Sequence, residues 1–99
     1  MEETTVLIIE DDSDILEVLS LYVQNAGYDV LKASTVKEGR EMFSSHSVDL
    51  VLIDINLPDG SGVELGKEIY QMGRAGIRIF DSRSFWQDWT RSGSRVSVS

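Results

Sequence analysis

The sequence predicts an α/β protein in which a parallel sheet carries helices on both faces. Short, β-branched apolar runs alternate with stretches of helical periodicity along most of the chain. The runs are almost continuously apolar, which is typical of parallel strands buried on both faces. Three such strand–helix units imply right-handed crossovers and a doubly wound sheet. About four strands and three helices are recognisable.

The first unit is a strand, an acidic loop and a helix. Residues 5–9 (TVLII) are the strand, and residues 10–12 (EDD) follow it directly. Ser13 and Asp14 offer side chains for the N-cap of the helix. Apolar residues then recur at helical spacing, and Gly27 stands where a glycine commonly ends a helix.

The second unit is shorter. Residues 28–33 predict a strand, and Thr35 with Glu38 has the spacing of a capping box. The helix that follows is expected to end near Phe43. After a polar loop, residues 48–53 form the third apolar strand.

The third unit begins at the end of that strand, where Asp54 stands. Residues 55–62 are rich in turn formers and predict a loop. Residues 63–72 predict a helix closed by Gly73, and residues 76–80 are a candidate fourth strand.

Length and composition exclude several classes of protein. The 99 residues suffice for one small domain. The absence of cysteine excludes disulfides and thiolate metal sites. No apolar run reaches the roughly 18 residues of a membrane helix, and the acidic N-terminus is unlike a signal peptide. We therefore expect a cytoplasmic protein with no membrane association.

The charge is strongly acidic and unevenly distributed. The net charge of −8 argues against direct nucleic-acid binding by this chain and favours a cation or a basic partner. Residues 1–76 contain 15 acidic residues and five Lys or Arg, whereas residues 77–99 contain two acidic residues and four Arg.

The alternation of apolar strands and amphipathic helices stops at about residue 80. Residues 81–99 contain six serines and both tryptophans, without helical or strand periodicity. We therefore divide the chain into a domain of residues 1–80 and an atypical Ser/Arg/Trp-rich tail of residues 81–99. A shifted reading frame or a junction with foreign sequence would explain the change, and sequencing the gene would decide it.

Acidic side chains follow two strands of the predicted sheet. Parallel strands end at the same edge, so Glu10, Asp11 and Asp54 are expected to converge. Three neighbouring carboxylates repel one another unless a cation shares the site, and Mg²⁺ suits oxygen ligands and a phosphate. An Asp can also attack phosphorus and form an aspartyl-phosphate. The structural alternative is that Glu10, Asp11 and Asp12 only complement a helix N-terminus, a role that suits Asp54 less well because it precedes a turn.

Two motifs resemble the receiver domain of bacterial two-component response regulators. They are the acidic pair after the first strand (residues 6–12, VLIIEDD) and the pattern D-x-x-x-P-x-x-x-G after the third (residues 54–62, DINLPDGSG). The resemblance covers residues 4 to about 80. It is nearest to the group in which a winged-helix DNA-binding domain follows the receiver, and it implies a flavodoxin-like fold.

The resemblance implies a role for individual residues. Asp54 would be the phosphoacceptor, receiving its phosphoryl group from a phosphohistidine of a sensor histidine kinase. Glu10, Asp11 and Asp54 would hold Mg²⁺, together with the backbone carbonyl of Asn56. Such a domain is phosphorylated with the help of Mg²⁺ but is not a turnover enzyme.

Further roles follow for the loops. Pro58 and Gly62 would shape the loop after the phosphoacceptor, and Asp12 would cap the first helix or support the metal ligands. The first helix would carry much of the surface that docks the kinase.

The end of the chain departs from the family pattern. The hydroxyl expected after the fourth strand is Ser82 or Ser84, unless Asp81 occupies that position. No Lys follows Lys67, so the phosphate-pairing Lys is absent, and the fifth strand is not recognisable.

These departures lead us to expect impaired switching. They also predict an incomplete sheet with one open edge, and self-association or segment exchange rather than a stable monomer. In the alternative, residues 85, 86 and 89 (Phe, Trp and Trp) cover the exposed core. The competing function is a non-catalytic pseudo-receiver that dimerises or docks a partner.

Overall fold

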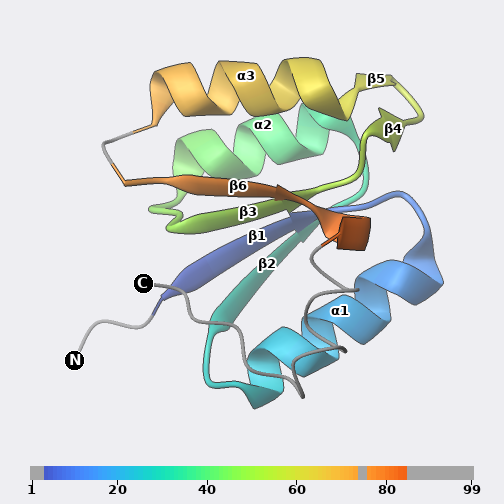
Figure 1. Ribbon diagram of the computed structural model, residues 1–99, viewed down its shortest axis with the longest axis vertical. Coiled ribbons are helices and arrows are strands. Elements are labelled where there is room, and N and C mark those ends of the chain that lie inside the picture. The colour runs from blue at the N-terminus through green and yellow to red at the C-terminus, as the bar shows by residue number, and fades with distance from the viewer. Residues whose placement is uncertain (1–3, 74–75, 85–99) are drawn as a thin grey trace.

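The computed structural model describes residues 4–73 and 76–84 of the chain. Four parallel strands form one sheet in the order β2-β1-β3-β6, as Figure 1 shows. The strands are β1 (Thr5–Ile9), β2 (Asp29–Ala33), β3 (Leu50–Ile53) and β6 (Arg78–Asp81). The order reverses between β1 and β3, which is the mark of a doubly wound sheet.

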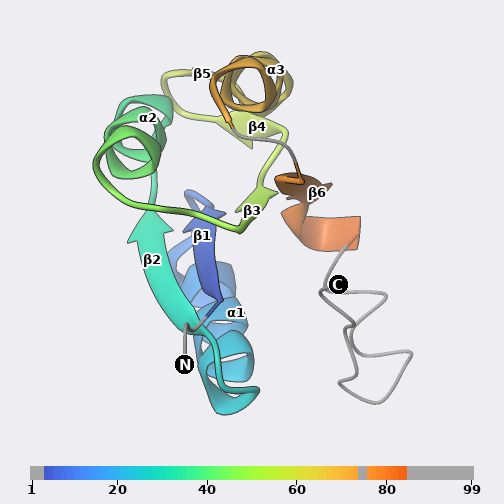
Figure 2. The ribbon, with the colours of Figure 1, turned by 90° about the vertical axis from the view of Figure 1, so that its left-hand side faces the viewer.

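Helices cover both faces of this sheet. Helix α1 (Ser13–Asn25) lies on one face, and α2 (Val36–Ser45) and α3 (Gly62–Met72) lie on the other (Figure 2). The predicted α/β class and the helices on both faces are therefore confirmed. Within the described ranges, no helix combines the length and the apolar character needed to cross a membrane.

The two central strands supply both hydrophobic cores. Successive side chains of a strand point to opposite faces, so each strand contributes to two layers. Leu7 and Ile9 of β1 pack with Leu65 and Ile69 of α3, whereas neighbouring strand residues pack with α1. All four residues of β3 are buried. This burial explains why the central runs lack the polar alternation of a half-exposed strand.

Helix capping follows local side-chain chemistry, with one correction to the prediction. The N-cap of α1 is Asp12, whose carboxylate accepts from the backbone N–H of Asp14 and Ile15 at 2.9 and 3.2 Å. The capping role that the resemblance implies for Asp12 is thus confirmed, whereas Ser13 and Asp14, the other candidate caps, are the first residues of the helix. Gly27 has a φ of +97°, as expected of a glycine that follows a helix.

The capping box of α2 forms only in part. Thr35 accepts from the N–H of Glu38 at 3.0 Å, as predicted. The carboxylate of Glu38 does not take the N–H of Thr35, which would complete the box, but accepts from the N–H of Ser34 at 3.0 Å and from its hydroxyl at 2.7 Å. The helix also continues to Ser45, two residues beyond the predicted end.

Strand limits differ from the predicted ones because hydrogen-bond pairing, not hydrophobicity, sets them. Val48 is buried beside the sheet but precedes β3, and β6 begins two residues later than predicted and extends to Asp81. The predicted loop 55–62 contains a small antiparallel hairpin of β4 (Asn56–Leu57) and β5 (Gly60–Ser61).

Two helical glycines give opposite predictions. At Gly39 of α2 an added Cβ would lie 2.6 Å from Cδ1 of Ile9 and 3.2 Å from Cδ2 of Leu65, both fully packed core residues. At Gly66 of α3 the nearest atom would be Cγ2 of Ile79 at 3.7 Å, an ordinary contact.

We expect Gly39→Ala to lower the free energy of unfolding by about 1–2 kcal/mol through overpacking. Gly66→Ala is expected to raise it by about 0.5–1 kcal/mol, because alanine favours the helix. Urea unfolding of the two variants measures both changes. A Gly39→Ala variant at least as stable as the parent would contradict the close α2–β1 packing.

Candidate functional site

The site lies where β1 and β3 end side by side. Glu10 follows β1 and Asp54 follows β3, and both residues still form backbone hydrogen bonds with a neighbouring strand. The N–H of Glu10 donates to the carbonyl of Ala33, and the N–H of Asp54 donates to the carbonyl of Ile9, each at 2.9 Å. The backbone of both acids is therefore held by the sheet, at the point where the strand order reverses.

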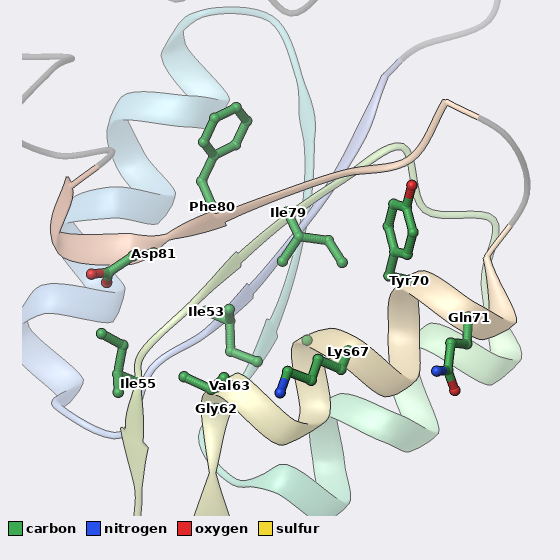
Figure 3. Close-up of a pocket in the computed structure, with 11 residues that line it drawn as sticks. Ile53, Ile55, Gly62, Val63, Lys67, Tyr70, Gln71, Ile79, Phe80 and Asp81 are labelled. Carbon is green, nitrogen blue, oxygen red and sulfur yellow. The ribbon is translucent and has the colours of Figure 1, made fainter.

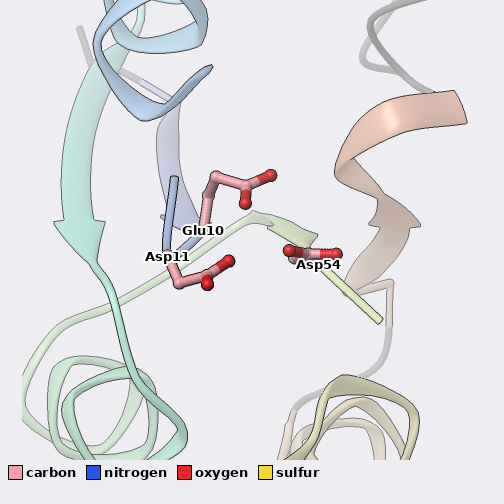
Figure 4. A group of neighbouring side chains, drawn as sticks. All are labelled: Glu10, Asp11 and Asp54. Carbon is pink, nitrogen blue, oxygen red and sulfur yellow. The ribbon is translucent and has the colours of Figure 1, made fainter. Parts of the chain in front are cut away.

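Three carboxylates converge at this edge. Glu10, Asp11 and Asp54 each offer an oxygen, and these oxygens all lie within 4.8 Å of one another. Glu10 and Asp54 are buried, whereas Asp11 is exposed. Figure 4 shows the three side chains directed toward one common space. The predicted convergence of these residues is observed.

Glu10 is the most perturbed member of the cluster. Its side chain is fully buried, and burial together with a hydrogen bond to the Asp54 carboxyl raises its pKa from near 4.5 to about 7. Two hydrogen-bond donors lower the pKa of Glu10 and offset part of this shift. The hydroxyl of Ser82 donates to Oε1 at 3.1 Å, and the N–H of Asp12 donates to Oε2 at 3.3 Å.

The chemistry of the cluster suits a hard divalent cation. Among the residues that the structure describes, the ion pairs are Lys32 with Glu17 and Arg40 with Glu68. No described Lys or Arg therefore neutralises the cluster. Carboxylate oxygens are the ligands that Mg²⁺ prefers, and an ion would stabilise the ionised form of Glu10, which burial and the Asp54 carboxyl disfavour.

The loop after Asp54 is held close to the acidic cluster. The N–H of Asn56 donates to Oδ1 of Asp54 at 3.3 Å, and the N–H of Gly62 donates to the carbonyl of Ile55 at 2.7 Å. A Cβ at Gly62 would overlap the carbonyl oxygen of Asp54. Only glycine allows α3 to begin this near to Asp54.

The structure distinguishes the three candidates for the position after the fourth strand. Asp81 is the last residue of β6 and pairs in register with Ile53. Ser82 is fully buried and contacts Glu10, whereas Ser84 is exposed and its hydroxyl lies 3.5 Å from Asp81. Of the two hydroxyls, only that of Ser82 lies at the acidic cluster.

One contact at the site had no signal in the sequence. The resemblance suggests Ser82 as a partner of the phosphoryl group, whereas in the structure its hydroxyl contacts Glu10. These residues stand 72 positions apart, and only the pairing of β1, β3 and β6 brings them together. The three Phe and Trp residues expected to cover the core, at positions 85, 86 and 89, lie outside the described residues.

The raised pKa of Glu10 makes stability depend on pH. The folded state favours the protonated form of Glu10. The contribution of this group to the stability of the fold is therefore complete below pH 4.5 and is lost as the pH rises through 7. Between pH 5 and 7.5 the free energy of unfolding of the metal-free protein should fall by about 1–2 kcal/mol more than that of Glu10→Gln, after allowance for solvent screening.

Urea unfolding at the two pH values measures this difference. Glu41→Gln, on the exposed surface of α2, is the matched control and should retain the parent's pH dependence. Equal pH dependence in the parent and in Glu10→Gln would contradict the raised pKa.

Comparison with known proteins agrees with this geometry. Residues 6–84 match the response regulator receiver domain family. The KDP operon transcriptional regulatory protein KdpE of Escherichia coli is 31% identical over 81 residues, which are 82% of this chain and 36% of that protein. The chain spans between 16% and 36% of the length of curated relatives of this kind.

Solved structures of receivers have the same fold. The response regulator TrrA of Thermotoga maritima, in complex with Mg²⁺ and BeF, superposes with a TM-score of 0.67 at 33% identity, covering 70% of this chain and 60% of that one. The complex of the histidine kinase ThkA with TrrA gives a TM-score of 0.72 at 31% identity, covering 78% and 66%. On the family match and the shared fold, the chain belongs to the response regulator receiver domain family.

Proposed function

We propose that this chain accepts a phosphoryl group from a phosphohistidine of a sensor histidine kinase onto Asp54. The observation that carries the proposal is the convergence of Glu10, Asp11 and Asp54 at one strand edge. A carboxylate oxygen of Asp54 attacks phosphorus, the P–N bond of the phosphohistidine breaks, and the imidazole nitrogen keeps the bonding electron pair. The product is an aspartyl-phosphate, so the chain is a phosphoacceptor and not a turnover enzyme.

The metal ligands follow from the same geometry. Mg²⁺ would be held by Glu10, Asp11 and Asp54, with the backbone carbonyl of Asn56, and would neutralise charge on the transferred group. TrrA was solved with Mg²⁺ and BeF, which supports this assignment. The proximity of Asn56 to Asp54 also supports it.

Ser82 is our candidate for the hydroxyl that contacts the phosphoryl group. It is buried at the cluster, where its hydroxyl donates to Glu10. To donate to a phosphoryl group on Asp54, the Ser82 hydroxyl would have to break its hydrogen bond to Glu10. No Lys follows Lys67 in the sequence, and we therefore propose that phosphorylation occurs but that the resulting switch is impaired.

The partner and setting follow from the relatives. The ThkA–TrrA complex supports a sensor histidine kinase as phosphoryl donor, and we propose that the exchange takes place in the cytoplasm. Relatives such as KdpE are transcriptional regulatory proteins, which supports a role in gene regulation. We retain the division near residue 80, with a tail of different origin, as a proposal based on composition.

A second candidate function is self-association at the open edge of the sheet. Among the described residues, β6 has a neighbouring strand on one side only. A groove of about 490 Å³ lies between β6 and α3 (Figure 3). Its lining includes Val63 and Tyr70, which are 47% and 69% exposed. An unpaired strand edge beside an apolar groove favours pairing with a second copy.

Phosphorylation is tested with acetyl phosphate and Mg²⁺. The parent should become labelled on one residue, and Asp54→Asn should abolish labelling, because an amide is not a nucleophile toward phosphorus. Phosphate-sensitive gel mobility and mass spectrometry measure the product. Asp29→Asn, at the opposite end of the sheet, is the control. Labelling of Asp54→Asn as strong as in the parent would show that another residue is the acceptor.

Self-association is tested by light scattering over micromolar concentrations. The average molar mass of the parent should exceed the 11.1 kDa of a monomer. Tyr70→Lys in the groove should shift the equilibrium toward monomer, because association would bury the new charge. Leu21→Lys on α1 replaces an apolar residue that is 49% exposed and adds the same charge away from the groove, so this variant should associate like the parent. A monodisperse 11.1 kDa parent would argue against this function.

A further inference from the structure

One side chain fastens the β4–β5 hairpin to the beginning of α2. Oδ1 of Asp59, in the turn of the hairpin, accepts from the N–H of Val36 at 2.7 Å. Oδ2 of the same carboxylate accepts from the N–H of Lys37 at 3.1 Å. These two amides belong to the first turn of α2 and have no partner within the helix. Figure 2 shows the hairpin close to this end of α2.

The two hydrogen bonds complete the capping of α2. Thr35 already accepts from the N–H of Glu38, so Thr35 and Asp59 together satisfy three successive amides. The same N–H groups, that of Val36 foremost, hold the pKa of Asp59 below its usual range. The carboxylate is therefore charged at neutral pH and complements the positive end of the helix.

Packing around this contact is also close. A Cβ at Gly60 would lie 3.3 Å from Cγ2 of Val36, so the hairpin backbone rests on that side chain. Leu57 of β4 is buried in the core cluster against which Val36 packs. The hairpin is thus attached to α2 by hydrogen bonds and by apolar contact.

The other end of the hairpin is the phosphoacceptor segment. Asn56 pairs with Ser61 and donates its N–H to Asp54, and the N–H of Gly62 closes the loop on Ile55. The hairpin therefore has two attachments, one at Asp54 and one at α2. Movement at the α2 attachment would displace Asn56, whose carbonyl is a proposed metal ligand.

We propose that Asp59 is a positioning residue that holds the phosphoacceptor loop in the geometry required for metal binding at Asp54. The attachment itself is independent of the proposed function, whereas its effect on the metal rests on that function. Asp59 does not touch the metal site, and its effect is transmitted through the hairpin.

The test compares three variants of the full chain. Asp59→Ala removes both hydrogen bonds, and Asp59→Asn keeps one carbonyl oxygen as an acceptor. Glu38→Ala is the matched control, because Glu38 is an acidic residue of the same helical turn whose carboxylate accepts from Ser34 and does not contact the hairpin. The first readout is amide hydrogen exchange at Asn56 and Gly62 without metal, and the second is Mg²⁺ affinity by calorimetry.

We expect Asp59→Ala to accelerate exchange at these two amides by about tenfold and to weaken Mg²⁺ binding by about tenfold. Asp59→Asn should lie between Asp59→Ala and the parent in both readouts. Glu38→Ala should change both by no more than about twofold, although it lowers the stability of α2.

Two results would overturn the proposal. One is that Asp59→Ala accelerates exchange no more than Glu38→Ala does. The other is that the parent and Asp59→Ala bind Mg²⁺ equally. A parent that binds no Mg²⁺ contradicts the proposed function and the effect on the metal, while the exchange readout still decides the attachment. If Asp59→Ala does not fold, Asp59→Asn and Glu38→Gln serve as the compared pair.

Discussion

The parallel pairing of β1 with β3 is the constraint on which the site depends. It places Ile9 opposite Ile53, so that the residues which follow, Glu10 and Asp54, leave the sheet together. Both strands are buried on both faces, and the core on each side opposes any change of register. The distance between the two carboxylates is therefore a property of the sheet, not of flexible loops. A site for one ion needs this rigidity, because its ligands must be in place before the ion arrives.

The same pairing also lowers the stability of the fold locally, because it buries two carboxylates next to each other. Two buried carboxylates at adjacent strand ends repel each other, and burial with the Asp54 contact raises the pKa of Glu10 to about 7. Ser82 and the Asp12 backbone donate to Glu10 and offset part of this cost. A core evolved only for stability would place apolar side chains here. Carboxylates that are unfavourable without a cation are what a metal-assisted phosphoacceptor requires.

Away from the strand ends, close packing and side-chain hydrogen bonds hold the segments around the site. Gly62 lets α3 begin against the Asp54 carbonyl, and Asp59 attaches the intervening hairpin to α2. At the other side of the sheet, β6 carries Asp81 and Ser82 to the same edge as Asp54. This strand is both a support of the site and the described edge of the sheet, so the proposed association at β6 and the proposed chemistry at Asp54 involve the same element.

The sequence by itself determined the α/β class, the order of the strands and helices, and the acids at the ends of β1 and β3, because these depend on periodicity and on residues close in the chain. It was less reliable for strand limits, and it offered Asp12, Ser13 and Asp14 as caps of α1, of which Asp12 forms the cap. Only the tertiary structure decided the Ser82–Glu10 contact, the attachment of Asp59 to α2 and the packing at Gly39. Each joins residues more than 20 positions apart, and such contacts arise from how the layers pack, which local sequence patterns do not encode.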